Sequence, residues 1–188
     1  MRYLSDDHEL ATRLATEAGE LLLALRRELV EEGLDERELK DRGDRASHKW
    51  LTAELADARP RDAVLSEEAT TDESRDTGRL ESERVWSIDP VDGTRELSEG
   101  RTDWAVHVAL SIGGQPVVGA VSLPGLGEVF STGSPVEIPA SPPRLRVVVS
   151  RTRPPAEALA IADALGAELV EMGSAGAKTM SKRILARS

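Results

Sequence analysis

The ten residues Val85–Thr94, with the sequence VWSIDPVDGT, constrain the fold of this chain more than any other stretch. Their first four residues form a short apolar run, which predicts a buried strand. Pro90 fixes its own φ and keeps Asp89 extended, while Gly93 permits a tight turn close to a ligand. Asp89 and Asp92 are therefore expected to leave the end of one rigid strand together.

This turn carries several oxygen atoms that could bind a metal ion. The Val91 carbonyl stands between two carboxylates and the Thr94 hydroxyl follows them, which suits a hard divalent cation such as Mg²⁺. Asp-Pro and Asp-Gly are also ordinary turn formers, and either pair alone indicates no more than a turn. The complete string IDPVDGT is much rarer, and it favours the metal site.

A second pair of acidic residues, Glu67 and Glu68, follows the predicted strand Ala63–Ser66. Such a pair usually lies on the exposed surface and has no functional role, because glutamate is seldom buried without a partner. Here two neighbouring strands would direct their carboxylates to one point. Like charges about 4 Å apart repel by roughly 4 kcal/mol at an effective dielectric constant of about 20. The cluster therefore predicts a bound cation.

Two helices are expected before this strand. The first, from Ser5 to about Glu32, has leucine and alanine at three- and four-residue spacing. The charged stretch Gly33–Gly43 predicts an exposed loop, and a second helix follows over Arg45–Ala58. Asp44 lies where a helix N-cap belongs. Helix capping and a catalytic role explain Asp44 equally well, so both interpretations stay open.

An antiparallel meander is predicted after the central motif. Its three strands alternate or follow turn signals, and they cover Trp104–Ile112, Pro116–Leu123 and Gly127–Thr132. His107 lies on the face opposite the apolar residues of its strand. We interpret it as a packed sheet histidine and not as a metal ligand, since no second histidine lies at ligand spacing.

The stretch Gly133–Arg144 is rich in proline and serine and predicts a domain boundary, with an α+β domain over 1–140 and an α/β domain over 145–188. A strand–helix–strand–helix pattern follows it, which predicts a parallel pair with a right-handed crossover. The turn beginning at Gly173 could bind an anion through backbone N–H groups, or it could be a simple tight turn. With so few strands and helices, this second domain is expected to be incomplete.

Charge and composition limit the partners. The chain has no cysteine, and its net charge of −10 excludes general binding to a nucleic-acid polymer. No apolar run is long enough for a membrane span, and the acidic start does not resemble a signal peptide, so a cytoplasmic protein is expected. An anionic substrate remains compatible with the charge only if metal ions occupy the site.

These residues together resemble the inositol monophosphatase superfamily of Mg²⁺-dependent, Li⁺-inhibited phosphatases. The main motif is Trp86–Thr94, preceded by Ser66-Glu67-Glu68 in the same order as in the superfamily. Within it the chain is most similar to CysQ-type 3′(2′),5′-bisphosphate nucleotidases of actinobacteria. The stretches that carry this similarity are Asp62–Glu68, Val85–Glu96, Asp103–Leu110 and Gly173–Lys178. The resemblance implies a layered αβαβα sandwich of the sugar-phosphatase kind.

The resemblance also implies the metal ligands. Glu67, Asp89 and the Val91 carbonyl would hold a first Mg²⁺, and Asp89 with Asp92 would hold part of a second, in a family that uses two or three ions. An aspartate of a Trp-Asp motif completes the second site in family members. No such motif follows Gly173–Lys178 in this sequence, so a remnant that is inactive or binds one ion is the alternative expectation.

Catalytic and substrate roles follow from the same resemblance. Thr94, oriented with Asp44, would position and deprotonate a water held by the metal, for in-line attack on phosphorus. The amides of Gly93 and Thr94 would touch the phosphate. The residues implied near the rest of the substrate are Ser150, Gly173, Ser174 and Ala175.

The expected substrate is a small phosphorylated molecule. The resemblance favours removal of the 3′-phosphate from 3′-phosphoadenosine 5′-phosphate, a reaction of sulfur assimilation. Inositol 1-phosphate and fructose 1,6-bisphosphate are the alternatives, and a homodimer is left open.

Overall fold

The computed structural model describes residues 2–33, 35–68, 82–134, 140 and 144–184. The elements follow in the order α1 (Arg2–Glu31), α2 (Glu36–Ala58), β1 (Ala63–Ser66), β2 (Arg84–Asp92), α5 (Thr94–Ser98), β3 (Ala105–Ile112), β4 (Gln115–Leu123), η1 (Pro124–Leu126), β5 (Glu128–Ser131), β6 (Arg146–Ser150), α6 (Ala156–Ala164), β7 (Glu168–Met172) and α7 (Ala175–Ile184). Within these ranges no helix combines the length and the apolar character that a bilayer crossing requires.

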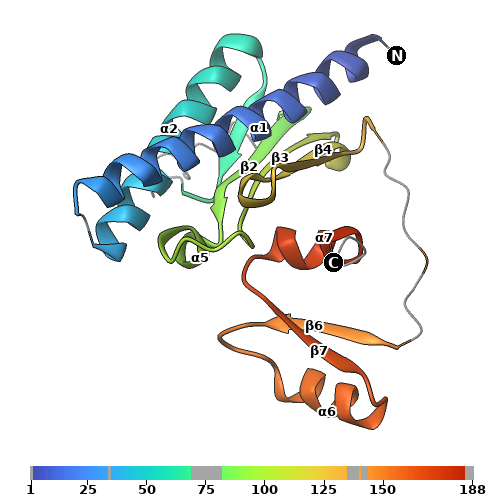
Figure 1. Ribbon diagram of the computed structural model, residues 1–188. Helices are drawn as coiled ribbons and strands as arrows, with labels where there is room; N and C mark the ends of the chain where they lie inside the picture. The colour runs from blue at the N-terminus through green and yellow to red at the C-terminus, as the bar shows by residue number, and fades with distance from the viewer. Residues whose placement is uncertain (1, 34, 69–81, 135–139, 141–143, 185–188) are drawn as a thin grey trace.

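The layers alternate between helices and sheets (Figure 1). Helices α1 and α2 lie over one face of a five-stranded sheet of order β1-β2-β3-β4-β5. Helix α7 lies against the other face, followed by the two-stranded sheet β6-β7 and then by α6. This order confirms the predicted αβαβα sandwich.

The larger sheet is mixed. Strands β2 to β5 pair antiparallel, which confirms the predicted meander, but β1 pairs with β2 in parallel. Parallel neighbours end at the same edge of a sheet. The residues that follow β1 and those at the end of β2 are therefore brought together.

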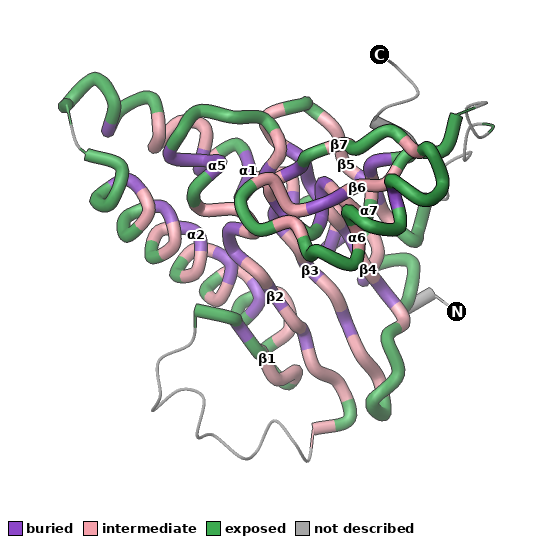
Figure 2. The backbone as a smooth tube through the Cα atoms, turned by 90° about the horizontal axis from the view of Figure 1, so that it is seen from below, coloured by how far each residue is buried: buried purple, intermediate pink, exposed green. Residues whose placement is uncertain are grey.

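The core lies between α1, α2 and this sheet. The alternation predicted for the strand after the motif is confirmed, since Trp104, Val106, Val108 and Leu110 are all at most 1% exposed. Buried segments recur along β2 and β3 in Figure 2, whereas α6 is almost wholly exposed. Apolar side chains on the outer unit stay open to solvent, among them Leu145 and Leu165, each 58% exposed.

Helix α2 begins nine residues earlier than the predicted Arg45. The Asp35 carboxylate caps it by accepting hydrogen bonds from the amides of Arg37 and Glu38, both 2.9 Å long. The predicted loop over 33–43 was therefore wrong for most of its length, because a cap with acidic residues in the first turn outweighs the cost of an internal glycine. Asp44 lies inside the helix, so the N-cap interpretation of Asp44 was wrong too.

An ion-pair network joins α1 and β2 to the turn between α2 and β1. Asp7 is 1% exposed and accepts from the guanidinium groups of Arg59 and Arg84 at 2.8–2.9 Å. Arg84 also donates to Asp62 at 3.0 Å, and the Trp86 indole N–H donates to the same carboxylate at 2.9 Å. These partners are far apart in sequence, so no local pattern indicates them.

The second unit matches the predicted strand–helix–strand–helix pattern. Strands β6 and β7 pair in parallel, and Pro155 is the N-cap of α6. The predicted boundary falls largely on residues 135–139 and 141–143, which lie outside the described residues. Helix α7 joins the two units, because Met172 and Ala177 are buried with Ala105, Leu123 and Phe130.

Candidate metal centre

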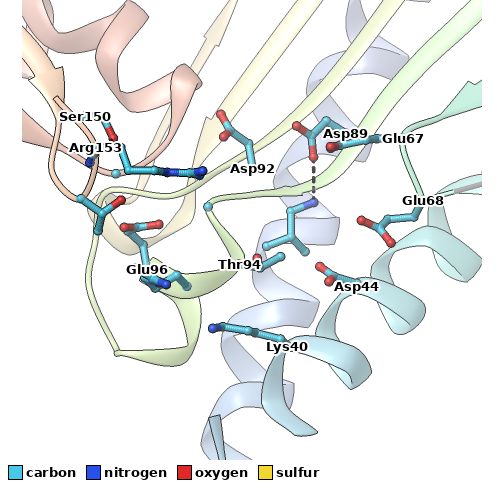
Figure 3. A pocket seen from close by; sticks show the side chains of 15 residues that line it. Lys40, Asp44, Glu67, Glu68, Asp89, Asp92, Thr94, Glu96, Ser150 and Arg153 are labelled. Atoms are coloured by element: carbon cyan, nitrogen blue, oxygen red, sulfur yellow. Dashed lines mark hydrogen bonds between the residues drawn. The ribbon is translucent and has the colours of Figure 1, made fainter. Parts of the chain in front are cut away.

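One cleft of about 710 Å³ receives most of the predicted site residues (Figure 3). The predicted residues that line it are Asp44, Glu67, Asp89, Val91, Asp92, Gly93, Thr94, Ser150 and Gly173. Ser174 and Ala175 are not among the lining residues, and Ser174 is 2% exposed. Glu68, Lys40, Arg95, Glu96, Thr152 and Arg153 complete the lining.

The motif runs through the end of β2 and into α5. Asp89 and Asp92 both belong to β2, with a register shift between them. Gly93 follows with a φ of 96°, which favours glycine, and a Cβ there would lie only 3.1–3.3 Å from Ser174, Trp104 and Glu96. Thr94 begins the short helix α5.

Helix α2 holds both carboxylate-bearing strand ends in place. The buried Ser47 hydroxyl donates to the Pro90 carbonyl at 3.0 Å, inside the motif. On the next residue, His48 Nδ1 hydrogen-bonds to Ser66 Oγ at 2.8 Å, just before Glu67. The same helix carries Asp44 into the cleft. Neither contact follows a sequence rule, since both join segments that only the folded sheet brings together.

Burial and nearby like charges raise the pKa values of two carboxylates in the cleft. The pKa of Asp89 is raised to about 7 by burial and then by the nearby Glu67 and Asp92 carboxylates. The pKa of Asp44 is raised to about 7, again first by burial and next by Glu68 and Asp89. Asp44 Oδ1 is buried and has no hydrogen-bond partner among the described residues. A buried unpartnered oxygen within a set of hard oxygen donors fits a divalent cation.

The pKa of Asp92 is lowered, in contrast to those of Asp44 and Asp89. Burial would raise its pKa, but hydrogen bonds from His107 and from the amides of Gly176 and Ala175 outweigh burial and lower it. Ala175 N donates to Oδ1 at 3.0 Å, and Gly176 N donates to Oδ2 at 2.6 Å. An ionised carboxylate has about four acceptor sites. With three donors bound, Asp92 retains one site for a cation.

His107 touches this carboxylate directly. Its Nε2 lies 2.9 Å from Asp92 Oδ2, and ionised Asp92 can only accept, so Nε2 carries the proton. One potential ligand atom from each of Asp89, Asp92 and His107 lies within 4.8 Å of the others. The interpretation of His107 as only a packed sheet residue was incomplete, because it orients a motif carboxylate.

The turn before α7 binds protein carboxylates. Gly173 N donates to Asp103 Oδ2 at 2.7 Å, and Ser174 N donates to the Asp103 carbonyl at 3.1 Å. The amides of the next two residues, Ala175 and Gly176, bind the Asp92 carboxylate. The anion predicted at this helix start is thus supplied by the chain itself, and the Ser174 hydroxyl caps the helix through Ala177 N at 2.9 Å.

Metal-free protein is expected to lose stability as pH rises from about 4 to about 7. Asp44 and Asp89 have pKa values near 7 when folded and an ordinary value of 3.8. In this window the folded chain binds more protons than the unfolded chain, so raising the pH favours unfolding. We expect the Tm in EDTA to fall across pH 5–8, by about 2–4 °C for each kcal/mol lost.

Two comparisons check this expectation. Asp44→Asn should flatten the decline, and Mg²⁺ should raise the Tm more at pH 8 than at pH 5. A Tm in EDTA that increases through the same window would contradict the electrostatic description.

Converging carboxylates at one edge of a layered sandwich, beside a threonine that begins a helix, form an oxygen-rich site that suits a divalent cation. The sequence profile of the inositol monophosphatase family matches residues 4–141. The chain belongs to this family.

Named relatives refine the comparison. A protein of Mycobacterium leprae called 3′-phosphoadenosine 5′-phosphate phosphatase is 46% identical over 190 aligned positions, which cover 93% of this chain and 68% of the relative. A protein of the same name from Mycobacterium tuberculosis is 47% identical over 88% of this chain and 63% of its own length. The chain thus spans about two thirds of each relative.

Solved structures agree on the fold. CysQ from Bacteroides thetaiotaomicron, a bacterial member of the inositol monophosphatase family, superposes with a TM-score of 0.74. The two chains are 22% identical, and the superposition covers 92% of this chain and 74% of the other.

Proposed function

We propose that this chain carries the metal and catalytic residues of a Mg²⁺-dependent phosphomonoesterase that removes the 3′-phosphate of 3′-phosphoadenosine 5′-phosphate. The observation that carries the proposal is the convergence of Asp44, Glu67 and Asp89 on one cleft, with Asp44 Oδ1 unpartnered. The mycobacterial relatives with that name support the choice of substrate.

The donor set suits Mg²⁺. Carboxylates of Glu67, Asp89 and Asp92 with the Val91 carbonyl are the hard oxygen ligands that this ion prefers. When bound, Mg²⁺ supplies Lewis-acid activation and compensates charge on the attacking and leaving oxygens. Burial is the main cause of the raised pKa of Asp89, and Mg²⁺ would also compensate the repulsion from Glu67 and Asp92 that adds to it.

Residues of the chain provide positioning and proton transfer. Thr94 begins α5 on the same cleft as Asp44, which comes from α2 (Figure 3). In the metal-free chain the pKa of Asp44 is raised to about 7, first by burial and then by neighbouring carboxylates. A cation bound beside it would lower that pKa, so Asp44 would be ionised and able to accept a proton near neutral pH. Asp44 would take the proton through the Thr94 hydroxyl, which would hold the attacking water. The Gly93 and Thr94 amides would orient the phosphate.

The deciding experiment measures Mg²⁺-dependent phosphate release from 3′-phosphoadenosine 5′-phosphate, inositol 1-phosphate and fructose 1,6-bisphosphate. We expect the first to be hydrolysed with the largest kcat/KM. A preference for either of the others would move the proposal to that substrate. No release from any ester, by a chain that still unfolds cooperatively, would contradict the proposal for residues 1–188 on their own.

The setting proposed for this activity is the cytoplasm, with a small phosphorylated substrate and not a nucleic-acid polymer. A net charge of −10 and the absence of cysteine support it.

A further inference from the structure

Helix α5 has only five residues, and it begins with Thr94 of the metal motif. A helix this short is not stable on its own in water, so its position depends on the contacts that hold it. On one side, Arg26 of α1 donates through Nε to the Leu97 carbonyl at 2.7 Å, and the Leu97 side chain is 3% exposed. This support comes from the helical layer that covers the larger sheet.

The second support of α5 comes from the outer unit, the part of the chain that carries β6, α6 and β7. Arg151 follows β6, and its Nη2 donates to Glu96 at 2.9 Å and to Glu99 at 2.7 Å. Glu96 belongs to α5, and Glu99 is its C-cap. The Arg151 amide donates to the carbonyl of Met172, the last residue of β7, at 3.1 Å. One residue thus ties both strands of the outer sheet to α5.

Glu96 is the residue through which the outer unit reaches the cleft. Its side chain is 8% exposed, and it lines the cleft, as Thr94 does (Figure 3). A second part of the outer unit also presses on it, because a Cβ on Gly173 would overlap the Cγ and Cδ atoms of Glu96. Among the described residues, the lining of the cleft includes Ser150 but not Arg151. Arg151 therefore contacts this lining through Glu96.

We propose that Arg151 is a positioning residue, which holds Thr94 in its place on the cleft by pairing with Glu96 and Glu99. This proposal rests on the proposed function, in which the Thr94 hydroxyl holds the attacking water. Loss of the Arg151 charge leaves Glu96 buried without its partner, which favours movement of that carboxylate toward solvent. Thr94 lies two residues earlier on the same helical turn, so it moves too. A displacement of about 1 Å at such a group can cost about 100-fold in rate.

Arg151→Gln is expected to lower kcat for 3′-phosphoadenosine 5′-phosphate by about 10- to 100-fold. The Mg²⁺ concentration that gives half the maximal rate should change by less than about threefold, because Asp89 belongs to β2 and Glu67 follows β1. Arg146→Gln is the matched control. Arg146 pairs with Glu168 between β6 and β7 at 3.4 Å. This pair lies within the outer sheet, so its loss should leave kcat unchanged.

Arg151→Lys tests whether the charge alone is enough. One nitrogen, Nη2, makes both contacts with the glutamates, and Nε is buried without a hydrogen-bond partner in the described part of the chain. A lysine ammonium is a compact charge with three donors, so it can supply the same pairing. We expect Arg151→Lys to keep kcat within about threefold of the wild-type value. A loss as large as that of Arg151→Gln would contradict a role that depends on this pairing.

A double-variant cycle shows whether Arg151 acts through Glu96. Glu96→Gln alone should lower kcat, and adding Arg151→Gln to it should lower kcat by less than about threefold more. If Arg151 contacted the substrate instead, its loss would reduce kcat by the same factor in both backgrounds. Losses that multiply in this way would overturn the proposal.

Hydrogen exchange in EDTA tests the same contact without turnover. The amides of Leu97 and Glu99 donate to carbonyls within the α5 turn. Arg151→Gln should speed their exchange at least about tenfold and leave that of β3 unchanged. Exchange of these two amides at the wild-type rate would overturn the proposal. If no ester is hydrolysed, the proposed function fails, and the exchange rates still decide whether Arg151 holds α5.

Discussion

Asp89→Asn is expected to reduce Mg²⁺-dependent phosphate release by about 1,000-fold or more. Asp89 lies between Glu67 and Asp92, and both carboxylates contribute to its raised pKa. Asparagine keeps the size of the side chain and removes its charge, so the cation loses a shared ligand. Steady-state kinetics across a Mg²⁺ titration measure the loss.

The same variant should be more stable than wild type in EDTA at pH 8, because a repulsive buried charge is gone. Lower activity together with a higher metal-free Tm would exclude unfolding as the cause. Asp57→Asn, on the exposed surface of α2, is the control and should leave both quantities unchanged. Retention of more than about a tenth of the activity by Asp89→Asn would contradict its assignment as a metal ligand.

Gly176→Ala is expected to destabilise the chain by about 1–3 kcal/mol and to loosen α7. A Cβ at Gly176 would lie 2.7 Å from both Ala105 Cβ and His107 Nε2. Alanine is a better helix former than glycine, so any destabilisation comes from this contact. Because the Gly176 amide also binds Asp92 at 2.6 Å, phosphate release should fall as well. Denaturant unfolding and limited proteolysis of the 145–184 segment measure the effect.

Gly119→Ala provides the comparison for this prediction. Among the described residues, a Cβ at Gly119 in β4 would meet Thr132 Cγ2 alone, at an ordinary 3.8 Å. We expect its free energy of unfolding to change by less than about 0.5 kcal/mol. Equal stability of the two alanine variants would show that α7 can move away from β3 without cost.

The parts of the site that were predictable from sequence depend on local chemistry. The motif Asp-Pro-Val-Asp-Gly-Thr restricts its own backbone through Pro90 and Gly93. The strand was predicted to end before Pro90, and that was wrong, since β2 continues to Asp92. The convergence of Glu67 with Asp89 needed one further step, the parallel pairing of β1 with β2, and that pairing is observed. The metal and catalytic roles themselves stay predictions until the kinetics are measured.

The parts that were missed depend on distant contacts or on competing local signals. Asp35 and Asp44 both suit an N-cap, but Asp35 caps α2 and the helix continues through Gly43, which packs near Leu97 and Leu22. Side chains whose partners lie many residues away gave no local signal, and these include Asp7, Ser47, His48 and His107.

Asp92 couples cation binding to the docking of α7. Its carboxylate holds the first turn of α7 and has one acceptor site left on the metal side of the cleft. Thermodynamic reciprocity then requires that any factor by which docked α7 changes cation affinity equals the factor by which the cation changes α7 docking. Measuring Mg²⁺ affinity in Gly176→Ala therefore also measures how strongly the ion stabilises the attachment of the outer β6-β7 unit.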